Sequence, residues 1–211
     1  MNFRTEVQIE KSPTKINHNQ KILLLGSCFA QNMQVKFAEG GFEAMHPFGA
    51  IYNPYSVSNS FKLIQECSKI NAEDLFFQKG LWNSYSFHSS YSNADKDIAL
   101  GQMNNTIGTA NEILNSTNPV IIITLGTSWV YELNETGNIV ANCHHSLASD
   151  FTRRFMDVEE IINILRPICE TSARIIFTVS PVRHLKDGAH ENQLSKSRLL
   201  LAVDKLISEY D

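Results

Sequence analysis

The sequence has no long run of apolar residues. No uninterrupted stretch approaches the roughly 18 residues that a membrane-crossing helix needs, so we predict no transmembrane segment and no membrane partner. Residues 1–20 are polar and lack the apolar core of a secretory signal, which predicts a cytoplasmic location.

Cysteine and basic residues are also sparse. The chain has 4 cysteines in 211 residues, none in the close pairs of a zinc site or a disulfide framework, so we expect free thiols, no metal and no cofactor. Cys143-His144-His145 is too irregular in spacing to predict a zinc site. The 18 Lys and Arg residues against 22 Asp and Glu give a net charge of -4, which argues against nucleic acid as a partner.

What the chain does contain is a set of short apolar runs. Hydrophobic residues make up 43% of the sequence, which is ample for a core. Residues 21–25, 120–125 and 174–179 are apolar on both faces, as in parallel strands that are covered on both sides. Each run stops at a small residue: Gly26, Gly126 or Ser180.

Helical spacing of apolar residues separates these runs. It predicts helices over residues 29–38, 56–68, 97–114, 158–169 and 195–210, with Asp157 capping the fourth. A turn at Asn134-Glu135-Thr136-Gly137 predicts a β-hairpin of residues 129–133 and 137–141, and residues 81–88 are strand-like. We therefore predict an α/β fold, a flavodoxin-like three-layer sandwich with a parallel sheet and a β-hairpin excursion. Residues 1–20 would be an N-terminal extension, and residues 21–211 a single domain.

In open parallel sheets, ligands bind outside the carboxyl ends of the strands. The first of these positions holds Ser27, at a turn between a strand and a helix, where free backbone N–H groups favour an oxyanion. Ser27 is either a nucleophile activated by a histidine or only the helix cap. Cys28 is a competing nucleophile, or a small core residue.

Several ordered motifs then resemble one family. Gly26-Ser27-Cys28-Phe29-Ala30 is similar to the pentapeptide that names the GSCFA family. Further segments at residues 46–54, 81–89, 124–131, 142–144 and 180–197 also resemble family motifs in order, so the resemblance covers roughly residues 20–205.

The resemblance implies an SGNH/GDSL-like hydrolase fold. By that analogy Ser27 is the nucleophile, and the N–H groups of Ser27 and Gly49 form the oxyanion hole. Gly126-Thr127-Ser128 falls where the relatives carry Gly-x-Asn-Asp, so Thr127 or Ser128 would replace the missing asparagine as a donor.

The same analogy places a catalytic Asp-x-x-His pair late in the chain. Asp187-Gly188-Ala189-His190 satisfies that spacing and is one candidate pair. The family pattern, however, has the pair after a further strand. We therefore expect this chain, which stops at Asp211, to be the nucleophile-bearing front of a longer hydrolase that lacks its base.

Six further residues are candidates for substrate binding because they lie in the matching motifs or near the predicted site: Asn53, Trp82, His88, His144, Arg183 and His184. Each histidine is alternatively an ordinary hydrogen-bonded loop residue. Trp82, Trp129, Phe48 and Tyr52 would line a sugar-binding cleft or belong to the core.

Two functions follow. The first is a serine ester hydrolase acting on an acylated glycan or another small ester. The second is a non-catalytic ligand-binding protein, or an inactive fragment, that uses the same cleft.

Overall fold

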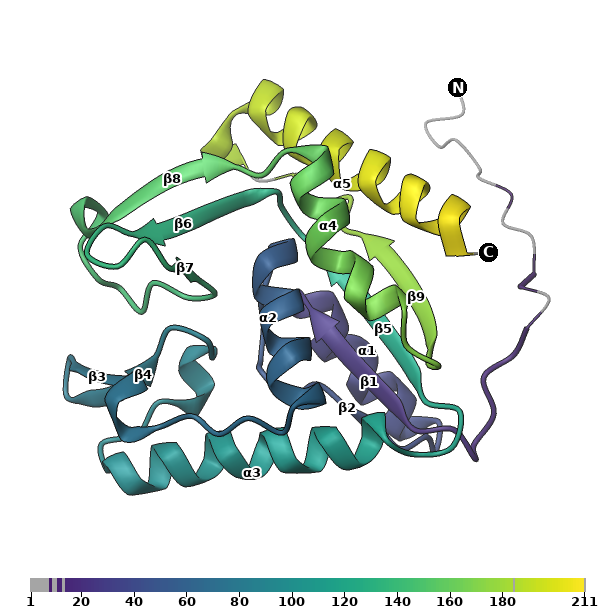
Figure 1. The fold of residues 1–211 in the computed structure, drawn as a ribbon, viewed down its shortest axis with the longest axis horizontal. Coiled ribbons are helices and arrows are strands. Elements are labelled where there is room, and N and C mark those ends of the chain that lie inside the picture. The colour runs from purple at the N-terminus through teal and green to yellow at the C-terminus, as the bar shows by residue number, and fades with distance from the viewer. Residues whose placement is uncertain (1–7, 9–10, 13, 184, 211) are drawn as a thin grey trace, which may run out of the picture.

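The computed structural model describes residues 8, 11–12, 14–183 and 185–210, and it contains a four-stranded parallel sheet (Figure 1). The strand order is β2-β1-β5-β9. The strands are β1 (Ile22–Gly26), β2 (Ala44–Met45), β5 (Val120–Leu125) and β9 (Arg174–Val179). The three predicted strands are confirmed, and the two-residue β2 is an addition too short to show a period in the sequence.

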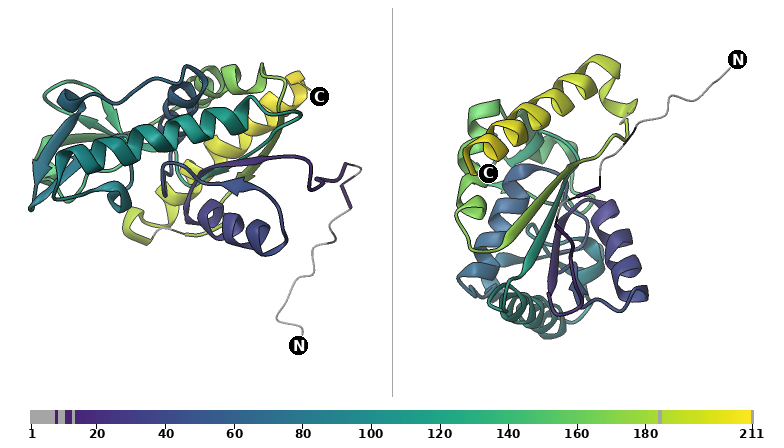
Figure 2. Two further views of the ribbon diagram at one scale, coloured as in Figure 1. Left: turned by 90° about the horizontal axis from the view of Figure 1, so that it is seen from below. Right: turned by 90° about the vertical axis from the view of Figure 1, so that its right-hand side faces the viewer.

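The sheet is apolar on both faces because both faces are covered. Successive side chains of a strand point to opposite sides. Ile22 and Leu24 of β1 pack with α1 (Cys28–Glu39), whereas Leu23 and Leu25 belong to the core on the other side. Figure 2 shows α1 alone on its side of the sheet.

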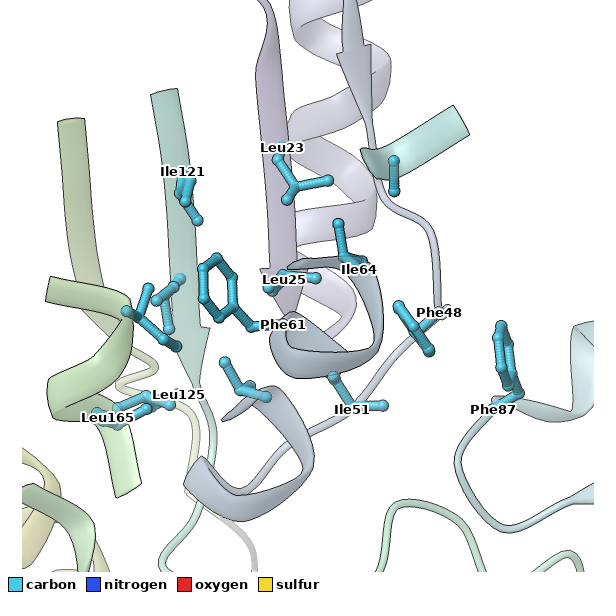
Figure 3. Close-up of a cluster of buried hydrophobic side chains, with 14 of the residues drawn as sticks. Leu23, Leu25, Phe48, Ile51, Phe61, Ile64, Phe87, Ile121, Leu125 and Leu165 are labelled. Atoms are coloured by element: carbon cyan, nitrogen blue, oxygen red, sulfur yellow. The ribbon is translucent and has the colours of Figure 1, made fainter. Parts of the chain in front are cut away.

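The other side is covered by α2 (Pro54–Gln65), α3 (Lys96–Leu114), α4 (Val158–Cys169) and α5 (Ala189–Tyr210). Figure 3 shows Phe61 and Ile64 of α2 and Leu165 of α4 against Leu25 and Leu125 of the strands. The predicted α/β sandwich is therefore confirmed.

Two helices begin two or more residues earlier than predicted. Helix α2 starts at Pro54, whose missing N–H costs nothing in a first turn, and the Asn53 side chain caps it. Helix α5 starts at Ala189. The apolar stripe that predicts a start at residue 195 begins only after the first turns of the helix. The predicted cap of α4 is correct: Asp157 Oδ1 accepts a hydrogen bond from Glu160 N at 2.8 Å.

The predicted hairpin is present but belongs to a three-stranded antiparallel sheet of order β7-β6-β8. Its strands are β6 (Trp129–Leu133), β7 (Ile139–Val140) and β8 (Phe151–Phe155). The strand-like run at residues 81–88 is shorter in the structure, where β3 (Leu75–Gln78) pairs with β4 (Leu81–Ser84). Short 3-10 helices cover Ala72–Asp74 (η1), Ser89–Tyr91 (η2), Ala148–Asp150 (η3) and Leu185–Asp187 (η4).

Candidate functional site

The carboxyl ends of β1, β5 and β9 meet at one edge of the sheet, and a hollow of about 450 Å³ lies there. We call it the apolar hollow. Its walls come from the ends of these strands, from the residues that follow them and from Tyr52. The lining residues are Ser27, Cys28, Phe29, Asn32, Tyr52, Thr124, Gly126, Thr178, Val179, Ser180, Pro181 and Val182. Parallel strands bring these sequence-distant residues together because they all end at the same edge.

Ser27 caps α1 and lines this hollow. Its Oγ accepts a long hydrogen bond from Phe29 N at 3.4 Å, and the residue is only 3% exposed. Its own N–H donates to Thr124 O at 3.1 Å. This N–H is therefore not free to bind an oxyanion, the role that the family resemblance implies, because it is already bonded to a carbonyl oxygen of β5.

Other backbone donors near Ser27 are free. Among the residues that the structure describes, neither Cys28 N–H nor Gly49 N–H makes a hydrogen bond. Gly49 has a φ of +70°, and a side chain there would strike His88 Cβ at 2.4 Å. The segment of Gly49 lies beside the Ser27 turn because Ile51 N donates to Gly26 O at 2.9 Å. Cys28 N–H and Gly49 N–H therefore differ from Ser27 N–H in having no hydrogen-bond acceptor among the described residues.

The backbone N–H groups of Thr127 and Ser128 already donate hydrogen bonds within the protein. Thr127 N donates to Tyr52 O at 3.1 Å, and Ser128 N donates to Ser195 Oγ of α5 at 2.8 Å. Thr127 Oγ1 also lies 3.0 Å from Ser195 Oγ, and Ser128 is fully buried. These two residues dock α5 on the end of β5. The Lys196 ammonium strengthens the same junction by donating to Gly126 O, and burial lowers its pKa.

A catalytic base is not assembled beside Ser27 within the described part of the chain, since no histidine there lines the apolar hollow. His46 is hydrogen-bonded to the residue before Ser27, because its Nε2–H donates to Gly26 O at 3.2 Å. Burial lowers the pKa of His46, so its ring is neutral at pH 7. Asp187 and His190, the predicted Asp-x-x-His pair, are not hydrogen-bonded to each other. Asp187 accepts from Arg153 Nη2 at 2.5 Å, whereas His190 is exposed. His184 lies outside the described residues.

A second hollow, of about 360 Å³, lies across Tyr52 from the first. We call it the aromatic hollow. It is lined by Ala50, Tyr52, Asn53, His88, Thr127, Trp129, Tyr131, Val140, Ala141, Asn142, Cys143, Arg153, Lys186 and Asp187.

A stacked column forms one wall of the aromatic hollow. The Arg153 guanidinium lies 3.7 Å from the Trp129 ring centre, and the other face of Trp129 stacks on Phe155 at 3.6 Å. Arg198 of α5 lies 4.1 Å from the Phe155 ring. Because both ring faces of Trp129 are covered, its free group is the indole N–H, which is buried without a partner among the described residues.

Comparison with known sequences decides the family. The profile of the GSCFA family matches residues 21–211, most of the chain. The chain belongs to the GSCFA family. Neither the curated proteins nor the solved structures include a match to it.

The GSCFA pentapeptide, residues 26–30, therefore comprises the last residue of β1, the Ser27 cap and the first residues of α1. One expectation about it was wrong: Cys28 is exposed at the hollow and does not pack in the core. Ala30 is the pentapeptide residue that is buried against the sheet.

Some of the predicted substrate-binding residues of the GSCFA chain line a hollow and others do not. His88 and Asn53 line the aromatic hollow, although the Asn53 side chain is occupied in capping Ser56 N at 2.8 Å. Trp82 lies outside both hollows, packed on Phe77 and under Lys96. His144 is buried, with Nε2 donating to Ser84 O at 2.7 Å.

Arg183 is exposed and lines neither hollow. The aromatic residues divide in the same way, since Tyr52 and Trp129 line the hollows whereas Phe48 is core. The residues that sequence reasoning missed are Tyr131 and Arg153, which face each other in the register of β6 and β8. Their signal was the shared face of Trp129 and Tyr131, two residues apart on one strand.

Within the described ranges no helix is both long and apolar enough to cross a bilayer. Over the same residues, no cluster of three or more histidine, cysteine or acidic side chains is arranged to hold a metal ion.

Proposed function

We propose that this GSCFA chain is a serine ester hydrolase of the SGNH type, with Ser27 as the nucleophile. The observation that carries the proposal is the position of Ser27, whose hydroxyl lies at the carboxyl edge of a parallel sheet, on the cap of a helix and in a 450 Å³ hollow. In the reaction, Ser27 Oγ attacks the ester carbonyl, the alcohol leaves, and water then releases the acid from the acyl-serine.

The developing oxyanion needs donors that are free before the reaction. Cys28 N–H meets that requirement because the first N–H groups of a helix have no partner within it. Gly49 N–H is the second unbonded donor, in the loop that Ile51 N holds against Gly26 O. The positive end of the α1 dipole adds to both.

The base is sought among the histidines. His46 is neutral at pH 7 and bonded to the residue before Ser27, His184 follows Val182 of the hollow by two residues, and His190 carries the Asp-x-x-His spacing. Replacing each in turn by alanine and recording the pH profile of hydrolysis identifies the base. The base variant loses the limb of the profile that reports a group near pH 6–7.

The alcohol side of the ester fits the aromatic hollow. Its lining includes the cationic side chains of Arg153 and Lys186 and the Asp187 carboxylate. Donors and an acceptor on one wall suit a polyhydroxyl group, which favours an acylated glycan over a simple alkyl ester.

Reaction with a fluorophosphonate tests the nucleophile directly. We expect covalent labelling of Ser27, and a loss of about 10³-fold or more in ester turnover in Ser27→Ala. Ser208→Ala is the control, since Ser208 is exposed, lines neither hollow and should retain turnover. Unlabelled Ser27 together with activity that survives Ser27→Ala would contradict the hydrolase proposal.

A second function rests on a separate observation. Asp187 is engaged by Arg153, and no described histidine lines the hollow of Ser27, so a binding protein that does not turn its ligand over is the alternative. It predicts no phosphonate labelling, and ligand binding that is unchanged in Ser27→Ala and His190→Ala.

A further inference from the structure

We propose that the apolar hollow holds the acyl chain of the substrate, so that this chain acts on esters of apolar acyl groups of several carbons and not preferentially on acetates. This inference rests on the proposed role of Ser27. It adds the chemical class of the group that Ser27 would carry.

Three polar side chains in the walls already have hydrogen-bond partners. Thr178 Oγ1 donates to Thr124 Oγ1 at 3.0 Å, and Asn32 Nδ2 donates to Cys28 O at 2.9 Å. Ser180 Oγ accepts from Val182 N at 3.3 Å. A ligand in this hollow thus meets few unpaired donors or acceptors beyond the Ser27 turn itself, and what remains for recognition is apolar surface.

That apolar surface is open to solvent beside the serine. Phe29, Tyr52 and Val182 all line the hollow and are 47%, 37% and 59% exposed. Large apolar side chains gathered in this way around one hydroxyl are typical of a ligand-binding surface. An acyl chain attached to Ser27 Oγ would cover them.

The size of the hollow agrees with a longer chain. Its 450 Å³ lies within the range of about 300–1,000 Å³ that small-molecule sites occupy, and the two carbons of an acetyl group would leave most of it empty. The aromatic hollow across Tyr52 carries Arg153, Lys186 and Asp187 instead. The two hollows that share Tyr52 therefore differ in polarity, and the one that Ser27 lines is the apolar one, which suits the acyl group.

The first experiment measures kcat/KM for nitrophenyl acetate, butyrate, hexanoate and octanoate. Each methylene buried in the hollow should raise kcat/KM by about fourfold until the hollow is full. Val182→Asp places a charge in the wall at an exposed position and should lower the octanoate-to-acetate ratio by about tenfold or more. The control is Leu147→Asp, which is 70% exposed, lines neither hollow and should leave the ratio unchanged. An acetate optimum, or a ratio that Val182→Asp does not lower, overturns the inference.

The second experiment does not need Ser27 to react. In Ser27→Ala protein, alkyl methanethiosulfonates of increasing length modify thiols, the thiolate forming a disulfide with the alkylthio group while methanesulfinate leaves. Cys28 lines the hollow, and Cys67 is an exposed cysteine outside it. The rate at Cys28 relative to Cys67 should rise severalfold from methyl to octyl.

The two experiments separate the inference from the proposed function. A rising Cys28 rate in a protein that hydrolyses no ester supports the apolar subsite while the hydrolase proposal fails. A constant ratio of the two rates shows that the hollow does not hold alkyl chains, even if esters are hydrolysed.

Discussion

At the residue scale, Gly26 shows how one backbone position fixes the candidate site. Its φ of +133° turns the chain out of β1, and a Cβ there would lie 2.2 Å from Thr124 O of the neighbouring strand. The same residue accepts hydrogen bonds from Ile51 N and His46 Nε2. The position of Ser27 thus depends on the absence of a side chain one residue earlier.

Gly26→Ala should therefore destabilise the protein more than an ordinary glycine replacement. Gly80 is the matched control, since its φ is also positive, at +81°, but nothing lies within 4 Å of its Cβ position. We expect Gly80→Ala to cost about 1–2 kcal/mol of unfolding free energy, from backbone strain alone. Gly26→Ala should cost more, because backbone atoms of β5 must also move. Urea unfolding of both variants measures the difference, and equal losses would show that the close approach to β5 is unimportant.

At the scale of elements, α3 contains two glycines that no neighbour requires. Neither Gly101 nor Gly108 has an atom within 4 Å of its Cβ position, and both lie in the interior of the helix Lys96–Leu114. The buried face of the helix is carried by other residues, such as Met103 and Ile107.

Gly101→Ala and Gly108→Ala should each stabilise the chain by roughly 0.5–1 kcal/mol, because glycine has the greater backbone freedom to lose in a helix. The expected result is a higher midpoint in urea unfolding with an unchanged slope. A lower midpoint for either variant would mean that the glycine serves a contact that the helix itself does not show.

The elements also show what the sequence could and could not predict. Strands β1, β5 and β9 were predictable because burial on both faces leaves an apolar run such as Ile121-Ile122-Ile123. Strand β8 was not, because its Phe151-Thr152-Arg153-Arg154-Phe155 sequence carries two charges.

Those charges are balanced only by tertiary contacts. Arg154 pairs with Glu132 and Glu160, and Arg153 pairs with Asp187. The same limit applies to the site: the edge of the sheet could be located from strand order, but Arg153 enters the aromatic hollow through cross-strand register, which no local pattern records.

At the scale of the whole molecule, two buried histidines tie separate parts of the chain together. His46 holds the turn after β1, and His144 holds the end of β4. Burial is the main cause that lowers the pKa of both. In the folded protein these two histidines therefore bind protons only at a lower pH than in the unfolded chain, where a histidine titrates near pH 6.5.

The stability of the whole chain should fall as the pH drops below about 6.5, since the unfolded state then binds more protons than the folded state. Each histidine contributes at most about 1.4 kcal/mol per pH unit to the slope. Urea unfolding between pH 5 and pH 7.5 measures it. His46→Gln should reduce the slope, whereas His190→Gln, an exposed histidine, serves as the control. If His46→Gln keeps the full slope, His46 is not a source of the acid sensitivity.

The order of the sheet has a consequence for the time course of folding. β1 pairs with β5, and the Gln20–Asn118 hydrogen bond beside that pair spans 98 positions of the chain. At a synthesis rate of about 5–20 residues per second, β1 is synthesised roughly 5–20 s before β5. During that interval the Leu23-Leu24-Leu25 run has only the short β2 as a strand partner. The strand that leads to Ser27 is therefore without its long sheet partner for part of the time in which the chain is being made.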